Sequence, residues 1–244
     1  RHKDITVRML LNHTSGLPGT NMNEMFSSEK ADDYPEQTMQ ELSKASLKHE
    51  PGAFSPYCND GFTVAQLVIE QISGIPYHQF LQERIFNPLG MDDTSAGFLP
   101  EEENMASAYA NRSVHLPKEF VNAVASGGIT STAKDLCRYA VATFSPTLLS
   151  RPGLYEFLKE QHPTYERDSS YDRMYSFGLG WDMTSWEPYA TEGIQVLGKS
   201  GGTLQYTAML FVLPQSQSAV ALLCAGHTDA VDTTLPIVDA LLKE

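Results

Sequence analysis

The sequence predicts an α+β protein in which helices come first and an antiparallel sheet comes last. Apolar residues recur at helical spacing through the first part of the 244-residue chain, and strand patterns dominate from about residue 176. Successive strands without helices between them indicate antiparallel pairing, because parallel strands need a long crossover. We expect a single domain over residues 1–244, with a mostly helical lobe at 5–175 and sheet strands plus a last helix at 176–244.

The first helix is predicted at residues 5–11, with Asp4 or Thr6 as its start signal and Val7, Leu10 and Leu11 on one face. A turn rich in Gly and Pro follows at 12–19. The polar residues 20–36 indicate a surface loop.

Two more helices are expected in the next segment, at Thr38–Leu47 and at Gly61–Ile72. Glu50-Pro51-Gly52 forces a turn between them, and Gly74 ends the second helix. That helix is strongly amphipathic. Its helically spaced apolar residues are Phe62, Ala65, Leu67, Val68 and Ile72.

The middle of the chain predicts a helix at Tyr77–Phe86, closed by the turn at 87–91. An irregular stretch to about residue 126 follows, in which the acidic run 101–103 is a solvated loop. The next helix is Ala133–Phe144, with Thr132 and Asp135 as a capping box.

The last part begins with a short helix near Pro152–Glu160 and a polar loop. A hairpin loop is expected at 214–217 and a closing helix at Thr234–Leu242. The predicted strands are Gly178–Met183, Gln195–Lys199, Ala208–Leu213 and Ala219–Cys224.

Composition excludes several classes of function. The formal net charge of −13 argues against binding to nucleic acid or to an anionic membrane, because both need a basic face. No apolar run approaches the ~20 residues of a membrane-spanning helix. Cys58, Cys137 and Cys224 show neither metal-ligand nor disulfide spacing, and we expect structural thiols and no metal or other cofactor.

Tyr57-Cys58-Asn59 follows a Pro-Gly turn and directly precedes a strong helix, which places a phenol and a carboxamide on one short loop. A phenol has a pKa of about 10 in water, and a neighbouring ammonium makes it a usable proton shuttle. An amide side chain can both donate and accept hydrogen bonds to a substrate. Taken alone, the triplet equally describes a turn Asn beside a packed Tyr.

Lys199-Ser200-Gly201-Gly202 lies at the end of the second predicted strand. A Lys at this place presents a positive charge to a carboxylate, and Ser200 adds a hydroxyl. Gly201 and Gly202 leave room for a substrate backbone along the strand, and the Gly202 N–H can face a developing oxyanion. Taken alone, the segment also describes a turn with a solvated Lys.

Together these segments resemble the second and third motifs of the class C β-lactamase and D,D-carboxypeptidase family of penicillin-recognising serine hydrolases, which also includes esterases and D-amino-acid peptidases. The resemblance covers essentially the whole chain in the right order. It extends to four further blocks: Ile5–Leu17, Phe86–Thr94, Gly127–Leu136 and Phe177–Trp181.

The resemblance implies a β-lactamase/transpeptidase fold and an acyl-enzyme mechanism. Tyr57 and Lys199 form the catalytic set among the printed residues. Asn59, Ser200 and Gly201 would contact a small-molecule or peptide substrate with a carboxylate, and Gly202 would supply half of the oxyanion hole. An envelope, periplasmic or secreted location rests on the resemblance alone.

The family's first motif, a Ser-x-x-Lys, has no credible match here. We expect the nucleophile, its Lys partner and the first strands in a missing N-terminal segment upstream of Arg1, and we expect the printed residues alone to be inactive. Two decoys spell the motif. Ser27-x-x-Lys30 lies in a polar loop after the wrong block, and Ser131-x-x-Lys134 occupies a block in which Ser and Thr cap a helix.

Three alternatives remain open from the sequence. The protein is a β-lactamase or carboxypeptidase, a carboxylesterase of the same family, or a binding member without catalysis. His13, in a tight polar turn, is expected to have a hydrogen-bonding structural role, and His227 to lie on the surface. Trp181 and Trp186 either line a cleft or pack in the core.

Overall fold

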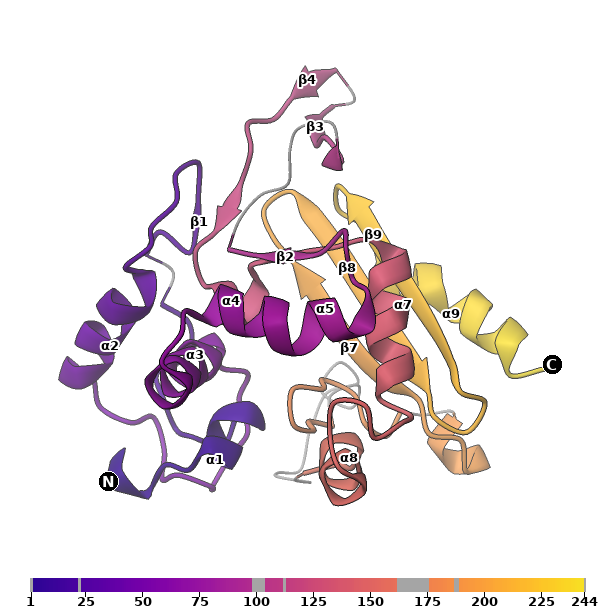
Figure 1. The fold of residues 1–244 in the computed structure, drawn as a ribbon, viewed down its shortest axis with the longest axis horizontal. Coiled ribbons are helices and arrows are strands. Elements are labelled where there is room, and N and C mark those ends of the chain that lie inside the picture. Colours follow the sequence, from indigo (N-terminus) through magenta and orange to yellow (C-terminus); the bar gives the residue numbers. More distant parts are fainter. Residues whose placement is uncertain are drawn as a thin grey trace.

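The structure is a computed structural model that describes residues 2–21, 23–97, 104–111, 113–161, 176–186 and 189–243. It confirms the α+β class, with an antiparallel sheet on one side and the first helices gathered on the other (Figure 1). The acidic run 101–103 and most of the polar loop after residue 160 lie outside the described residues.

The N-terminal part contains the first two helices, α1 (Val7–Leu11) and α2 (Tyr34–Lys44). The Thr6 side chain caps α1 by accepting a hydrogen bond from the Met9 N–H, as the start signal predicts. Leu10 is buried, but Val7 is 52% exposed, so the expected apolar face is only partly covered. Helix α2 begins four residues earlier than predicted, with Pro35 in its first turn, where Pro is tolerated.

The segment 20–36 is only in part the surface loop that its polarity predicts, because many of its described residues are exposed but three are buried. Strand β1 (Phe26–Ser27) pairs with β5 (Phe120–Val121), 94 residues further along the chain. Met25 and Tyr34 are buried in a small cluster with Ala123. Pairing and packing with distant residues, which local polarity does not report, anchor this segment.

Helix α3 (Asn59–Ser73) ends at Gly74, which has the left-handed φ of 73° expected of a terminating glycine. The predicted apolar face is not the most buried one. Phe62, Ala65, Leu67 and Val68 are half-buried and Ile72 is 82% exposed, whereas the buried residues are Asp60, Gly61, Thr63 and Gln66. The cause is the close packing of α1. A Cβ at Gly61 would lie 2.8 Å from the Leu10 carbonyl oxygen, so this face of α3 meets backbone rather than side chains.

The middle of the chain is built from short pieces. Helix α4 (Tyr77–Leu81) continues through a π-helical turn (Gln82–Phe86) into α5 (Asn87–Leu89), and ends at Gly90 with φ 63°. The described residues of the predicted irregular stretch form short elements. They are β2 (Ser95–Ala96), which pairs with β6 (Ile129–Thr130), the hairpin of β3 (Tyr109–Ala110) with β4 (Val114–His115), strand β5 and helix α6 (Val124–Gly127).

Helix α7 (Ala133–Ala142) begins as predicted, with the Thr132 side chain accepting from the Asp135 N–H. The Asp135 carboxylate instead accepts hydrogen bonds from the Asp93 N–H and the Thr94 hydroxyl and pairs with Arg138 at 2.7 Å. It therefore ties α7 to the turn after α5. Helix α8 (Arg151–Leu158) lies within one or two residues of its prediction and is capped by Ser150.

The main sheet consists of β7 (Leu197–Gly202), β8 (Tyr206–Leu213) and β9 (Ser218–Ala225) in that order, all antiparallel. Helix α9 (Ala230–Leu241) closes the described chain, and it begins four residues before the predicted start because Asp229 caps it. The predicted strand Gly178–Met183 is wrong. A turn in which the Gly178 N–H bonds the Trp181 carbonyl occupies it, and Met183 makes only isolated bridges.

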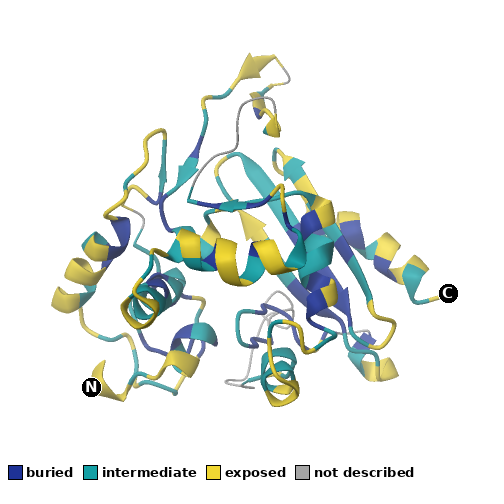
Figure 2. Cartoon of the chain, viewed as in Figure 1, coloured by how far each residue is buried: buried dark blue, intermediate teal, exposed yellow. Residues whose placement is uncertain are grey.

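The two faces of this sheet pack against different helices. Met209, Phe211 and Leu213 share a cluster with α9, and the alternate residues Leu210 and Val212 share one with α7. Buried residues accordingly concentrate on the sheet, whereas much of the outer surface of the helices is exposed (Figure 2). None of the helices in the described part of the chain has the length and apolar character that a bilayer crossing requires.

Candidate active site

The two predicted catalytic residues meet. The Lys199 Nζ lies 3.3 Å from the Tyr57 hydroxyl and 5.1 Å from the centre of the Tyr57 ring, although the residues are 142 positions apart. Lys199 lies in the middle of β7 rather than at a strand end, because the strand begins and ends later than predicted. Strand β7 is an edge strand, and Tyr57 directly precedes α3.

A carboxylate that sequence reasoning missed holds the Lys199 ammonium. The Asp182 oxygens lie 2.9 and 3.0 Å from the Lys199 Nζ, and one also accepts from the Ser200 N–H and hydroxyl at 3.2 Å each. Asp182 is 1% exposed. Burial alone would lower the pKa of Lys199, but Asp182 and Tyr57 outweigh it and raise that pKa above its ordinary value.

An aromatic wall supports Tyr57 on the side of the N-terminal turn. The His13 ring lies 4.5 Å from the Tyr57 ring and 4.5 Å from that of Phe177. His13 has a φ of 63° and is 2% exposed, and its Nδ1 accepts from the Cys58 N–H at 3.0 Å. Burial, followed by the charge of Lys199, lowers the pKa of His13 to about 3, so the ring is neutral. The expected hydrogen-bonding role of His13 is confirmed.

Gly201 and Gly202 form the outer end of β7. The Thr203 N–H bonds the Tyr206 carbonyl, so Gly202 and Thr207 make the next, non-hydrogen-bonded pair, and the Gly202 N–H points away from β8. The Ser200 N–H points to the same side, where it reaches Asp182. A Cβ at Gly201 or Gly202 would meet no protein atom closer than 3.9 Å, so packing within the described chain does not require glycine there.

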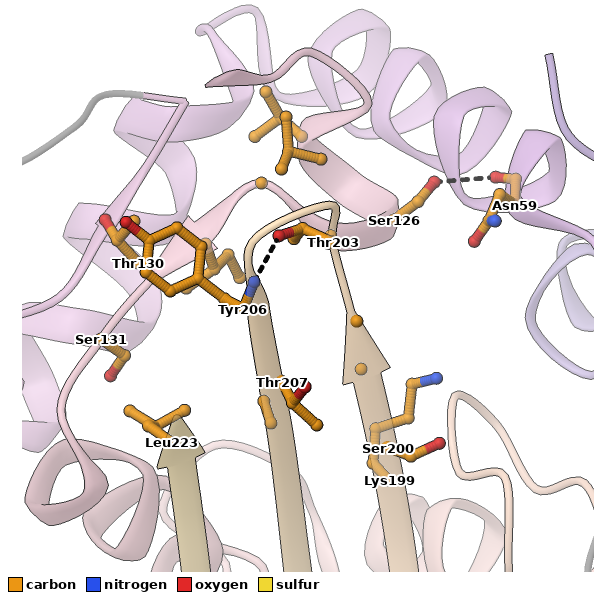
Figure 3. A pocket seen from close by; sticks show the side chains of 18 of the residues that line it. Asn59, Ser126, Thr130, Ser131, Lys199, Ser200, Thr203, Tyr206, Thr207 and Leu223 are labelled. Carbon is orange, nitrogen blue, oxygen red and sulfur yellow. Dashed lines mark hydrogen bonds between the residues drawn. The ribbon is translucent and has the colours of Figure 1, made fainter. Parts of the chain in front are cut away.

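A second buried carboxylate fixes the turn after β7. Glu119, 5% exposed, accepts hydrogen bonds from the Thr203 hydroxyl and from the Leu204 N–H. The Thr203 hydroxyl oxygen also accepts from the N–H groups of Gln205 and Tyr206 (Figure 3). This network fixes the turn that directly follows the glycines of β7.

Asn59 enters the same cavity from the first turn of α3, and not from a loop as predicted. Its side-chain amide nitrogen donates to the Thr20 hydroxyl at 3.0 Å, and its backbone carbonyl oxygen accepts from the Ser126 hydroxyl at 2.9 Å. Figure 3 shows Asn59 and Ser126 together across the cavity from Ser131. The structure therefore anchors Asn59 through Thr20 and Ser126.

All six predicted site residues line one cavity of about 1,740 Å³: Tyr57, Asn59, Lys199, Ser200, Gly201 and Gly202. Asp182, Glu119 and Trp186 line it as well. Trp181 is 3% exposed and packs against Phe157, and Trp186 is 8% exposed, so both tryptophans are core residues and Trp186 also faces the cavity. The described residues contain no group of three or more His, Cys, Asp or Glu side chains arranged to hold a metal ion.

Ser131 and Lys30 of the two decoys line the same cavity, but the serine hydroxyl of each decoy hydrogen-bonds partners other than Tyr57 and Lys199. The Ser131 hydroxyl hydrogen-bonds that of Thr94, and Lys134 is exposed on α7. The Ser27 hydroxyl accepts from the Glu29 N–H in the turn after β1. His227 is exposed, as expected, with Nε2 3.1 Å from the Leu204 carbonyl.

Asp182 and Glu119 are the functional side chains that sequence reasoning missed. Asp182 carried a usable signal, because an acid between Trp181 and Met183 in an apolar run must be buried and therefore needs a partner. Glu119 gave no such signal, since it follows the polar Lys118 in an irregular stretch.

Comparison with known proteins gives consistent results. The model of the beta-lactamase family matches residues 1–242. D-alanyl-D-alanine-carboxypeptidase/endopeptidase AmpH of Escherichia coli K12 is 29% identical over 219 residues, which cover 84% of this chain and 55% of that protein. Penicillin-binding protein 4* of Bacillus subtilis is 26% identical over 86% of this chain and 49% of its own length. The chain thus spans about half the length of these relatives.

Among solved structures, the D-amino acid amidase from Ochrobactrum anthropi SV3 complexed with D-phenylalanine superposes with a TM-score of 0.76. It is 25% identical, and the match covers 98% of this chain and 77% of that one. The octameric penicillin-binding protein homologue from Pyrococcus abyssi, 22% identical with a TM-score of 0.73, shares the fold.

Proposed function

The chain belongs to the beta-lactamase family, whose members are serine hydrolases, and we propose that the full-length protein hydrolyses an amide or ester through an acyl-enzyme. The substrates that we propose are acyl-D-amino acids, D-amino acid amides and related strained amides such as β-lactams. The printed names of the relatives, a D-Ala-D-Ala carboxypeptidase and a D-amino acid amidase, support this choice of class.

The observation that carries the proposal is the contact of Lys199 with the Tyr57 hydroxyl. The Lys199 ammonium donates to the Tyr57 hydroxyl oxygen and fixes its position in the cavity, where a side chain with a transferable proton can act as a proton shuttle. In the proposed reaction Tyr57 receives the proton of the attacking serine hydroxyl as the Ser O–C bond forms. It then returns the proton to the leaving nitrogen or oxygen when the substrate bond breaks.

The edge of β7 supplies the second element of the proposal. The Gly202 N–H points outward from the sheet on the same side as Lys199 and Asp182, where a substrate lying along the edge would place its carbonyl. A backbone N–H in this position stabilises the oxyanion of a tetrahedral intermediate. The absence of side chains at Gly201 and Gly202 leaves that approach open.

We propose that the nucleophilic serine and its lysine partner come from a segment outside these 244 residues. The size of the cavity supports this, since 1,740 Å³ exceeds the roughly 300–1,000 Å³ of a small-molecule site. It leaves room for a segment of chain beside a substrate. Asn59, in the first turn of α3, would contact the substrate amide or that lysine.

The test is labelling of the full-length protein with a fluorophosphonate, which reacts with activated serines. Tyr57→Phe removes the shuttle hydroxyl and is expected to slow labelling and substrate turnover about 10²–10⁴-fold. Tyr155→Phe is the matched control, because Tyr155 is 67% exposed on α8 and outside the cavity lining. Unchanged labelling of Tyr57→Phe, or no labelling of the natural protein, would overturn the proposal.

Substrate class is separated in the same protein by three assays. Turnover of nitrocefin indicates a β-lactamase, and release of D-alanine from acyl-D-Ala-D-Ala indicates a carboxypeptidase. Hydrolysis of p-nitrophenyl acetate without either of these indicates an esterase.

A further inference from the structure

The Lys199 ammonium already has a carboxylate and a hydroxyl as partners. Both Asp182 oxygens lie within hydrogen-bond distance of its Nζ, at 2.9 and 3.0 Å, and the Tyr57 hydroxyl lies at 3.3 Å. An ammonium has only three N–H donors to share among its partners. A substrate carboxylate that approaches this nitrogen therefore competes with Asp182 for the same positive charge.

Asp182 also engages the neighbouring donors that a substrate carboxylate would need. The Ser200 hydroxyl and N–H both donate to the same Asp182 oxygen at 3.2 Å. Asp182 is 1% exposed and therefore fixed in place. Lys199 and Ser200 thus already bind a carboxylate, and it belongs to the protein.

The charge of the cavity lining also disfavours the binding of a substrate carboxylate. The cavity lining contains eight Asp and Glu side chains but only two Lys side chains among the described residues. One of the two is Lys199, and the other, Lys30, lies 2.6 Å from Asp32. An anion entering the cavity therefore meets a compensated cation and an excess of negative charge.

We propose that Asp182 makes this site select substrates that are uncharged where they meet Lys199, such as carboxamides and esters, over substrates with a free carboxylate. The proposal rests on the proposed function and narrows its substrate class. It opposes the carboxylate-bearing substrate that the sequence predicts. Asp182 acts on specificity, and Tyr57 acts on the proton transfer.

The experiment compares two substrates that differ in one group, N-acetyl-D-alanyl-D-alanine and N-acetyl-D-alanyl-D-alaninamide, with the full-length protein. The specificity constants for cleavage of the same internal amide are measured from pH 6 to 9, and where turnover is slow, each compound competes against fluorophosphonate labelling. The natural protein is expected to prefer the carboxamide. Asp182→Asn is expected to shift the ratio toward the carboxylate about tenfold, the order of removing one unit charge several ångströms away.

Asp232→Asn is the matched control, because it removes the same charge from the cavity lining without touching Lys199. Its ratio should stay within about twofold of the natural protein. A preference for the carboxylate in the natural protein, or a ratio that Asp182→Asn leaves unchanged at every pH, overturns this inference while fluorophosphonate labelling still supports the hydrolase. Absence of labelling overturns the proposed function instead. Ser200→Ala removes one donor to Asp182 without a change of charge, and it keeps the inference testable if Asp182→Asn does not fold.

Discussion

Two buried carboxylates hold strand β7, one beside its middle and one at the turn beyond its far end, and they differ in what they bind. At the middle, Asp182 pairs with the Lys199 ammonium and the Ser200 donors. At its far end, Glu119 accepts from a hydroxyl and an N–H, at Thr203 and Leu204. Asp182 thus pairs with a charged group, whereas Glu119 binds neutral donors.

The difference separates two tasks along one strand. An ion pair in a buried place fixes both the position and the charge of its cation, so a change at Asp182 alters the electrostatics of the whole cavity. Neutral donors around Glu119 fix only the shape of the turn, and Leu204 is 63% exposed, so water can replace part of what is lost. The contribution to stability, its dependence on pH and the coupling between side chains should therefore differ between the Asp182–Lys199 pair and the Glu119 network.

The largest expected effect is that of Asp182→Ala on the free energy of unfolding. The change leaves the Lys199 ammonium and the Ser200 donors without their acceptor. Breaking a buried pair costs about 3–5 kcal/mol, and because the Lys199 side chain is 32% exposed we expect about 2–3 kcal/mol. Urea denaturation of the full-length protein measures it as a lower midpoint at unchanged slope.

Asp232→Ala serves as the control for this loss, because Asp232 is an exposed residue at the start of α9. It should stay within about 0.5 kcal/mol of the natural protein. If Asp182→Ala loses no more unfolding free energy than the control, solvent already screens the Asp182–Lys199 pair. The pair then does not differ from the Glu119 network in its effect on stability.

The sequence predicted what depends on local signals. Thr6 and Thr132 lie next to the helices that they cap, Gly74 ends α3, and apolar runs on either side of the loop at 214–217 marked β8 and β9. Tyr57 and Lys199 were placed together by resemblance to a family, not by any local pattern.

What failed depends on distant partners. Glu119 binds residues 84 and 85 positions away, and Asp182 binds Lys199 across 17 positions. The predicted apolar face of α3 is not its most buried one because α1 packs its backbone against Gly61, which hydrophobic spacing does not reveal. Only the Asp182 signal, an acid within an apolar run, was present in the sequence and missed.

The free energy of unfolding should depend on pH through His13, which packs against Tyr57 beside Lys199. The pKa of His13 is about 3 in the folded protein and 6.5 when exposed, so between these values the unfolded state binds more protons. Stability is therefore lost as pH falls below 6.5. From pH 7 to pH 5 the contribution of His13 amounts to about 2 kcal/mol, since one pKa unit corresponds to about 1.4 kcal/mol.

His13→Asn is the variant that isolates this term, because Asn accepts the positive φ of 63° and does not titrate. The unfolding free energy of both proteins is measured in urea at pH 7 and pH 5. His49, whose pKa burial also lowers, is present in both proteins and cancels in the difference. An equal loss of stability in the two proteins would show that His13 is not the buried neutral ring described above.

The smallest expected loss of stability is that at Glu119, in the turn after β7. Glu119→Ala leaves the Thr203 hydroxyl and the Leu204 N–H without an acceptor, at a cost of about 1–2 kcal/mol. Thr203→Ala and the double variant complete a double-mutant cycle, which measures the direct coupling of the two side chains. We expect a coupling of about 0.5–1 kcal/mol.

The Thr203 hydroxyl also accepts from the N–H groups of Gln205 and Tyr206, so Thr203→Ala should cost more than the coupling alone. Glu119→Gln keeps an acceptor for the Leu204 N–H and should cost less than Glu119→Ala. If Glu119→Ala costs as much as Asp182→Ala, neutral hydrogen bonds hold the strand as firmly as the ion pair does. The Asp182–Lys199 pair would then differ from the Glu119 network in charge alone. The preference for uncharged substrates would rest on that charge and not on the rigidity of Asp182.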